Sequence, residues 1–333
     1  MGTKVLTGLR MTLEAKSYTD ALHGILSHKG WTTWSKPMLS GLTATAFRFV
    51  VSRRLTSESP TAYNWVAENF LAADFIGITS SQQAGFSFDA TFPMYRDHAV
   101  SVIKESIDRE IGAVIWKDGF VIATGYNDES GQLYYSDGYS DRYESLDYAE
   151  FGLNESPYWY YQVLEGRIDL DEREMIKESL LQAVYKWESH DLMLPETEYA
   201  CGRNAYDALI QAFRSGEYDS EGAWEVLRCY AAAKRQLGLY GGMIRSHWQE
   251  SGEIAEQYSR VARLFQLMLD SDGQTSSLVP LFIQAQQAEE RAIRGIKRLM
   301  RETIDNRYGD ISLRFRTWIG SLLCLLFLSS RRQ

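Results

Sequence analysis

The spacing of apolar residues near the start of the chain predicts a helix over residues 17–30. Four apolar side chains would share one face of this helix: Ala21, Leu22, Ile25 and Leu26. Ser17 and Thr19 are of the type that caps a helix start, and Gly30 is of the type that ends one. The pattern therefore predicts an amphipathic helix with Ser17 at its N-terminal end.

Two more helices are predicted next, followed by a run of strands. One helix opens at Pro60-Thr61 and leads into a strand around residues 75–78, and another covers residues 94–112. Gly131 would be the left-handed residue of a hairpin turn. Helices followed by such a meander predict an α+β fold with an antiparallel sheet. The strands are expected where β-branched and aromatic residues gather, at residues 113–117, 120–126, 132–138 and 158–166.

The second half of the chain has helical periodicity almost throughout. Breaks between its helices are expected at Pro195, Gly216, Gly238 with Gly241-Gly242, and Asp272-Gly273. The chain should thus comprise an α+β domain (1–167), an all-α domain (168–317) and an apolar tail (318–333). Five helices are predicted, at residues 171–190, 200–215, 220–239, 241–271 and 276–307.

Composition is that of an ordinary globular protein. The 333 residues are 45% hydrophobic and 24% charged, which allows two domains and a sizeable core. The net charge is −9. Nucleic acid and anionic membranes both need a basic face, so we do not expect either to be the main partner.

Cysteine and histidine usage supports neither a disulfide framework nor a metal site. Cys201, Cys229 and Cys324 are odd in number and widely spaced, and the five histidines form no zinc-binding motif. No metal or other cofactor is therefore expected. The N-terminus lacks an apolar run of signal-peptide length, so the expected location is the reducing cytoplasm.

The end of the chain contains an apolar run of 11 residues, from Trp318 to Leu328. A membrane-spanning helix needs about 20 residues, so no membrane span is expected. We expect this run to pack on the body of the protein or on a partner, which leaves a homodimer as one candidate assembly.

The first helix and the hairpin at residues 117–139 each contain a characteristic set of intervals between residues. Leu22, Leu26 and Gly30 follow Ser17 by five, nine and thirteen residues. In the hairpin, Gly125-Tyr126 follows Gly119 by six residues, and Asp137 lies near the end of the next strand. The helix and the hairpin together resemble the papain-like fold of C39 peptidases. They are still more similar to the N-terminal domain of the butirosin biosynthesis protein H group of acyltransferases, which also carries a helical C-terminal domain.

The resemblance implies a papain-like first domain and assigns its catalytic triad to three positions. Ser17 stands where the family has its nucleophilic cysteine, Gly119 where it has histidine, and Asp137 where it has the orienting acid. A cysteine attacks because an adjacent imidazole takes its proton. With both the thiol and the imidazole replaced, the family's chemistry cannot run at these positions.

The main hypothesis is therefore a non-catalytic relative, a pseudoenzyme that retains the cleft for binding. Its ligand would be a small molecule, a peptide or a carrier protein. The candidate ligand contacts are aromatic: Trp34, Phe120, Tyr126 and Tyr139.

Two other functions remain open. One is an active acyl or amide transferase with Ser17 or Cys201 as its nucleophile. Cys201 precedes a predicted helix whose dipole would lower the pKa of its thiol, although most free cysteines are inert apolar residues. A histidine within hydrogen-bond reach of either nucleophile would favour this function, and His98 is more simply a surface residue. The other is a structural dimerisation protein.

Two polar segments have a simple and a functional interpretation. The sequence GYNDESG, from Gly125 to Gly131, has three acceptor side chains but lacks the spacing of an EF-hand, so we interpret it as a hairpin turn. The segment 135–148 interleaves acids with tyrosines, a combination that suits the binding of an amine. A solvated loop is the simpler interpretation of these residues.

Overall fold

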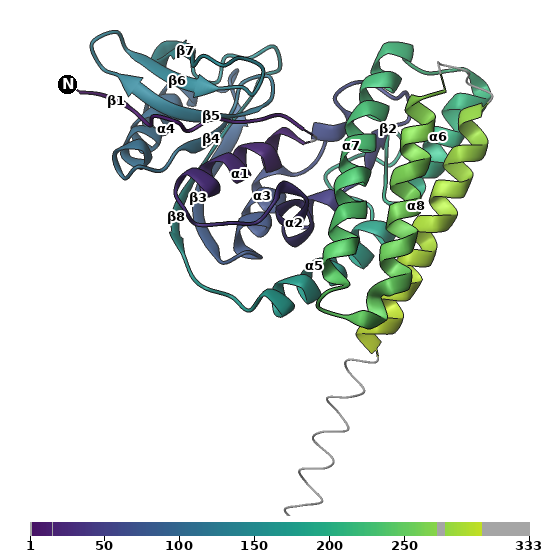
Figure 1. The fold of residues 1–333 in the computed structure, drawn as a ribbon. Helices are drawn as coiled ribbons and strands as arrows, with labels where there is room; N and C mark the ends of the chain where they lie inside the picture. The colour runs from purple at the N-terminus through teal and green to yellow at the C-terminus, as the bar shows by residue number, and fades with distance from the viewer. Residues whose placement is uncertain (1, 15, 272–276, 302–333) are drawn as a thin grey trace, which may run out of the picture.

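The computed structural model describes residues 2–14, 16–271 and 277–301. The described residues form a mixed α+β protein in which a sheet and its covering helices lie beside a layer of long helices (Figure 1). The α+β class predicted from the sequence is confirmed. Residues 302–307 of the last predicted helix, the tail 318–333 and Cys324 lie outside the described residues.

The sheet contains seven strands, and every pairing in it is antiparallel. The order is β3-β8-β4-β5-β6-β7, with β1 paired to the end of β5. The antiparallel meander β4-β5-β6 and the strand β8 confirm the predicted strands, and Gly131 has the left-handed φ of 68° expected of it. The strands of this sheet are β1 (Thr3–Val5), β3 (Ile78–Phe86), β4 (Ala113–Trp116), β5 (Phe120–Asn127), β6 (Gln132–Ser136), β7 (Glu144–Asp147) and β8 (Tyr158–Arg167).

Helices cover this sheet, and α1 contacts β5 at its centre. Helix α1 starts at Ser17 and buries its apolar face, so both its predicted position and its packing on the hairpin strand are confirmed. Helix α3 packs on β3, and α4 packs on β8. The helices of this half are α1 (Ser17–His28), α2 (Lys36–Leu42), α3 (Trp65–Asp74) and α4 (Phe92–Asp108), with the 3-10 turns η1 (Thr45–Phe47), η2 (Ser59–Thr61) and η3 (Tyr148–Glu150).

Two predictions for residues 59–86 were wrong. Pro60 and Thr61 belong to the separate turn η2, and α3 begins four residues later because Asn64 caps it by accepting a hydrogen bond from the Ala67 amide. The strand predicted around residues 75–78 instead begins at Ile78. Strand β3 is rich in Ser and Gln and forms one edge of the sheet. An edge strand with an exposed face does not need an apolar alternation, so its pattern gave no signal.

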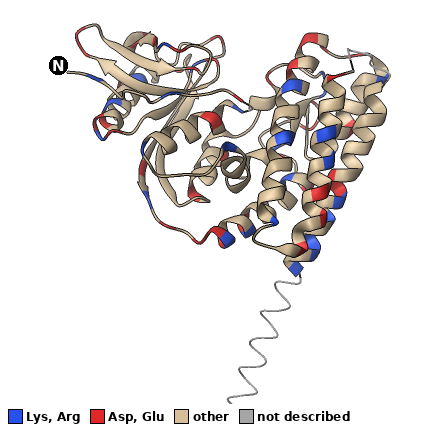
Figure 2. Ribbon diagram, in the orientation of Figure 1, with Lys and Arg blue, Asp and Glu red and all other residues tan. Residues whose placement is uncertain are grey.

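The second half is mostly helical but contains one strand. Strand β9 (Tyr199–Cys201) pairs antiparallel with β2 (Val50–Ser52), so the two halves share a small sheet and the all-α prediction was wrong in this detail. Residues 277–301 form a further helix. Along both α7 and α8, Glu residues stand near the N-terminal end and Lys or Arg residues follow further along the helix (Figure 2). The helices are α5 (Glu172–Glu188), α6 (Arg203–Ser215), α7 (Ser220–Ile244) and α8 (Gly252–Leu269), with the turn η4 (Gln249–Ser251).

Helix α7 runs through the glycines at which a break was predicted. A Cβ at Gly238 would lie 3.1 Å from the Cβ of Ala262, and one at Gly241 would lie 3.2 Å from the Cα of Ala255. The glycines therefore allow α7 and α8 to pack closely rather than end the helix, and the chain turns only after Ile244.

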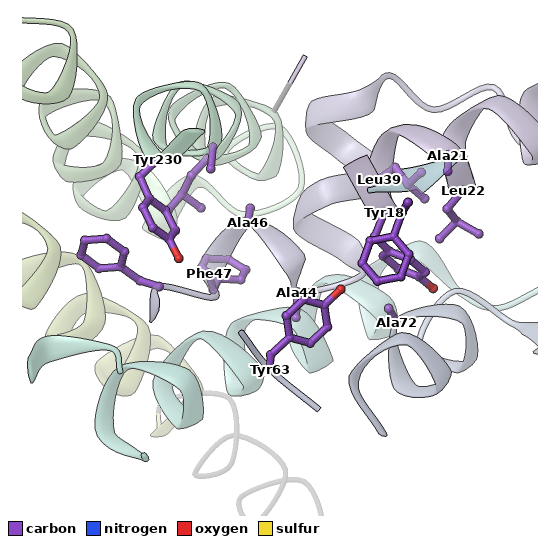
Figure 3. Close-up of a cluster of buried hydrophobic side chains, with 14 of the residues drawn as sticks. Tyr18, Ala21, Leu22, Leu39, Ala44, Ala46, Phe47, Tyr63, Ala72 and Tyr230 are labelled. Carbon is purple, nitrogen blue, oxygen red and sulfur yellow. The ribbon is translucent and has the colours of Figure 1, made fainter. Parts of the chain in front are cut away.

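Buried aromatic side chains join the sheet half to the helical half. Phe49 packs edge-on against Tyr206 and Tyr230, with ring centroids 4.8 and 4.6 Å away. The Tyr230 hydroxyl donates a hydrogen bond to the carbonyl of Val50 at 2.5 Å. Figure 3 shows Tyr230 on α7 beside the segment that follows Phe47, so one core crosses the boundary predicted between domains.

Gly41 on α2 is a second point of close contact between the halves, because the Tyr240 ring of α7 lies directly on it. We expect Gly41→Ala to destabilise the protein by about 1–3 kcal/mol, since the new methyl group would overlap that ring. Urea unfolding measures the change. Gly242→Ala is the matched control, because position 242 is helical and open, and it should be neutral or stabilising by up to about 1 kcal/mol. Equal effects of the two substitutions would contradict this account of the contact.

No helix in the described part of the chain is long and apolar enough to cross a membrane.

Candidate functional site

A pocket of about 440 Å³ opens beside the N-terminus of α1. Ser17, Gly119 and Asp137, the three positions assigned from the family resemblance, all line it. They come from the first turn of α1, the β4-β5 turn and the loop after β6. Residues that are 120 positions apart in sequence thus meet at one site.

Ser17 is the first residue of α1 and not its cap, which corrects the capping prediction. Lys16 occupies the N-cap position, and no side-chain cap hydrogen bond is present there. The Ser17 hydroxyl instead accepts a hydrogen bond from the backbone amide of Phe120 at 3.3 Å. This bond joins the start of α1 to the hairpin at the pocket.

Gly119 belongs to the tight turn between β4 and β5. Asp118 has the left-handed φ of 56° in this turn, and the Lys117 amide donates to the carbonyl of Gly119 at 2.8 Å. The φ of Gly119 is not left-handed, and a Cβ built on it meets no atom within 4 Å. A side chain at position 119 would therefore have room to point into the pocket.

The Asp137 carboxylate organises its own loop. Its Oδ1 accepts hydrogen bonds from the backbone amides of Tyr139 at 2.9 Å and Ser140 at 3.2 Å. These bonds fix the position of the acid at the pocket edge.

None of the residues that line this pocket is a histidine. His23 and His28 contact backbone carbonyls of Trp34 and Thr7, and His98 is exposed on α4. His190 contacts the carbonyl of Leu194, and His247 lies 3.0 Å from the Glu172 carboxylate. All five histidines lie in the described part of the chain, so no imidazole lines the pocket that contains Ser17.

Lys16 and Arg48 lie at the inner end of the pocket, and the sequence analysis missed both. Lys16 Nζ donates to the carbonyls of Thr45 and Arg48 at 2.9 and 2.6 Å. Burial lowers the pKa of Lys16 well below its usual value, and the neighbouring Arg48 lowers it further. The guanidinium of Arg48 stacks 3.4 Å above the ring centroid of Tyr63.

The Cys229 thiol also lines the pocket, from α7, and was missed as a site residue. Burial raises its pKa, although Lys16 and Arg48 act in the opposite direction. No sequence motif marks Lys16, Arg48 or Cys229, because they meet only when α7 docks onto the first half. A lysine directly before the predicted nucleophile position was the single available signal.

Cys201 directly precedes Gly202, the N-cap residue of α6, so its predicted position just before a helix is confirmed. It ends strand β9, is 7% exposed and lies in a separate pocket with His190. Burial raises the pKa of its thiol, the opposite of the predicted direction.

We therefore expect iodoacetamide to alkylate Cys201 and Cys229 more slowly than a free model thiol at pH about 7, because a raised pKa leaves less thiolate. Cys324, which lies outside the described residues, is expected to react no faster than the model thiol. Peptide mapping of the alkylated protein against glutathione as a reference measures the rates. Fast selective labelling of Cys201 would instead support the transferase hypothesis.

The four predicted ligand contacts divide into two pairs. Phe120 and Tyr139 line the pocket. Tyr126 does not, because it lies at the far end of β5, where its hydroxyl donates to Asp108 at 2.8 Å. Trp34 is also absent from the lining, since it follows α1 and its indole nitrogen donates to Glu172 at 3.2 Å. The prediction was therefore wrong for Tyr126 and Trp34.

The GYNDESG segment forms the β5-β6 hairpin turn. Asn127 Oδ1 accepts from the amides of Glu129 and Ser130, while Asp128 pairs with Lys104. In residues 2–14, 16–271 and 277–301, no group of three or more His, Cys, Asp or Glu side chains is arranged to hold a metal ion.

No protein-family model matches the chain, and no curated protein is detectably similar to it in sequence.

Proposed function

We propose that this protein is a non-catalytic relative of papain-like peptidases and acyltransferases that binds a ligand in the pocket at the start of α1. The observation that carries the proposal is the meeting of Ser17, Gly119 and Asp137 at one pocket without a thiol–imidazole pair among those three positions. The scaffold would thus be retained and the reaction lost.

The environment of Ser17 supports a binding role over a nucleophilic one. A serine needs a general base to attack, and no histidine lines its pocket. Lys16 is the nearest basic side chain in sequence, but its amine donates to two carbonyls, and no hydrogen bond joins it to the Ser17 hydroxyl in the described residues. The hydroxyl is accordingly placed to contact a ligand.

A fluorophosphonate probe tests the absence of catalysis, because it modifies only activated serines. We expect Ser17 to remain unmodified, as judged by mass spectrometry, with Ser17→Ala as the reference. Modification of Ser17 in the wild-type protein would contradict the proposal and favour the acyl or amide transferase with Ser17 as nucleophile.

A pocket-filling substitution tests the binding role. Gly119→Trp should block the pocket with little effect on folding, because the space around position 119 is open. In a ligand-observed NMR screen of small fragments, we expect the wild-type protein and the control Gly242→Trp to bind fragments that Gly119→Trp does not bind. An identical set of bound fragments for all three proteins would refute a role for this pocket.

A further inference from the structure

The inner end of the pocket holds two basic side chains that are removed from solvent. Lys16 and Arg48 are each 6% exposed and both line the pocket. Within the described residues, no carboxylate lies at ion-pair distance from Lys16, whose ammonium contacts carbonyls and the ring of Tyr230. Buried charges are normally paired with an opposite charge, so the pocket lacks the counter-ion that the charged form of Lys16 would need.

Arg48 has hydrogen-bond donors without acceptors. Its Nε and Nη1 atoms are buried and donate no hydrogen bond in the part of the chain that the structure describes. The nearest carboxylate is that of Glu68, at 3.7 Å from Nη1, and the same oxygen accepts a hydrogen bond from Lys186. Buried polar groups almost always have partners, so these donors indicate an acceptor supplied from outside the chain.

The start of α1 adds to the positive potential. The first amides of a helix carry a partial positive charge that attracts anions, and the Ser17 hydroxyl lies beside them. The acids of the pocket are already engaged, since Asp118 pairs with Lys117 at 2.7 Å and Asp137 accepts from its own loop. The inner end therefore favours a negative group.

We propose that the pocket binds a small molecule through an oxyanion, a carboxylate or a phosphate, held by Arg48, Lys16 and the Ser17 hydroxyl. This rests on the proposed binding function of the pocket and specifies its ligand. The aromatic side chains of Tyr63, Phe120 and Tyr135 line the rest of the pocket and suit an aromatic or apolar ligand body.

Four probes of similar size but different charge test the proposal: benzoate, phenyl phosphate, benzyl alcohol and benzylamine. We expect either benzoate or phenyl phosphate to bind about tenfold to about a hundredfold more tightly than benzyl alcohol in calorimetric titrations, the gain typical of hydrogen bonds to a charged group. Benzylamine should bind most weakly. Whichever of these two anions binds more tightly shows whether the oxyanion of the ligand is a carboxylate or a phosphate.

Two substitutions and a control locate the anion. Arg48→Gln and Lys16→Met should each reduce the preference for the anion over benzyl alcohol by about tenfold or more. Arg263→Gln removes the same charge from an exposed position of α8 outside the pocket and should change nothing. Unchanged anion affinity in folded Arg48→Gln and Lys16→Met proteins would overturn the proposal.

A measurement on the wild-type protein applies even if the Arg48 variant does not fold. Besides Arg48, the charged and titratable groups around Lys16 are Glu68, Lys186, Lys234, Cys229 and Tyr230. Because burial lowers the pKa of Lys16, an anion bound beside it should raise that pKa again and draw a proton from solution over the pH range in which the free lysine is partly deprotonated. Titrations in two buffers of different ionisation enthalpy measure this uptake, which Lys16→Met should abolish. Anion binding without proton uptake throughout this range would count against the assignment.

The outcomes also separate this inference from the proposed function. Binding of benzyl alcohol or benzylamine as tightly as the anions, but sensitive to Gly119→Trp, would refute the oxyanion while leaving the binding pocket in place. Binding of any probe that Gly119→Trp does not affect would refute both.

Discussion

Replacing Lys234 with methionine is expected to destabilise the protein by about 3–5 kcal/mol. The side chains of Lys234 and Glu289 are 1% and 5% exposed, and the ammonium lies 2.6 and 2.7 Å from the two carboxylate oxygens. Tyr206 also donates to Glu289, at 2.5 Å. The substitution would leave this carboxylate buried without its charge partner.

The size of the effect follows from the unpaired charge and not from the pair itself. Replacing both partners, in Lys234→Met with Glu289→Leu, should recover much of the lost stability, because no charge then remains buried. Tyr206 would still lose its acceptor, so full recovery is not expected.

Urea unfolding of these variants gives the free energies. Lys297→Met is the matched control, since Lys297 pairs with Glu188 at the surface, with side chains 44% and 49% exposed. It should change stability by about 0–1 kcal/mol. If Lys234→Met were no more destabilising than this control, the buried pair would not contribute as described.

The strongly periodic elements could be predicted from the sequence. Helix α1 and the strands β4, β5 and β6 each carry an apolar face or run whose periodicity distinguishes a helix from a strand. The positions predicted for these elements were therefore correct. The residue intervals that resemble the papain-like pattern predicted that Ser17, Gly119 and Asp137 lie close together. In the structure, all three line one pocket.

The remaining features depend on tertiary contacts that a local pattern does not contain. The glycines of α7 have the local pattern of helix breakers, and their role becomes clear only from the close packing of α8 on them. Segments β2 and β9 form strands because they pair with each other. Arg48 stands between Phe47 and Phe49 in an apolar run, where the local pattern does not show that its charge is buried. It becomes a buried part of the pocket wall because the segment around it joins the two halves of the molecule.

Introducing the cysteine and histidine of the proposed papain-like relatives at positions 17 and 119 is expected to produce an activated thiol. In Ser17→Cys with Gly119→His, the thiol would lie at the N-terminus of α1 and the imidazole would occupy open space beside the same pocket. An adjacent imidazolium and a helix N-terminus both stabilise a thiolate. We expect the pKa of the introduced thiol to fall by about 1–3 units below the ordinary value of about 8.5.

Lys16 and Arg48 would lower the thiol pKa even without the histidine, so two controls are needed. Ser17→Cys alone measures the effect of the existing cations and the helix. Ser17→Cys with Gly119→Gln adds a side chain of similar length that cannot ionise. Turnover is not required of the double variant, because the pocket need not retain donors for an oxyanion.

The most direct test of the proposed papain-like arrangement is the pH dependence of alkylation of the introduced thiol in these three variants. The arrangement predicts that the thiol pKa is lower with histidine at position 119 than with glycine or glutamine, by about one unit or more. It also predicts that Asp137→Asn reduces this difference, because the acid would orient the imidazole and stabilise its charged form. A thiol pKa that is the same with histidine, glycine or glutamine at position 119 in folded protein would show that positions 17 and 119 do not form the family's catalytic pair.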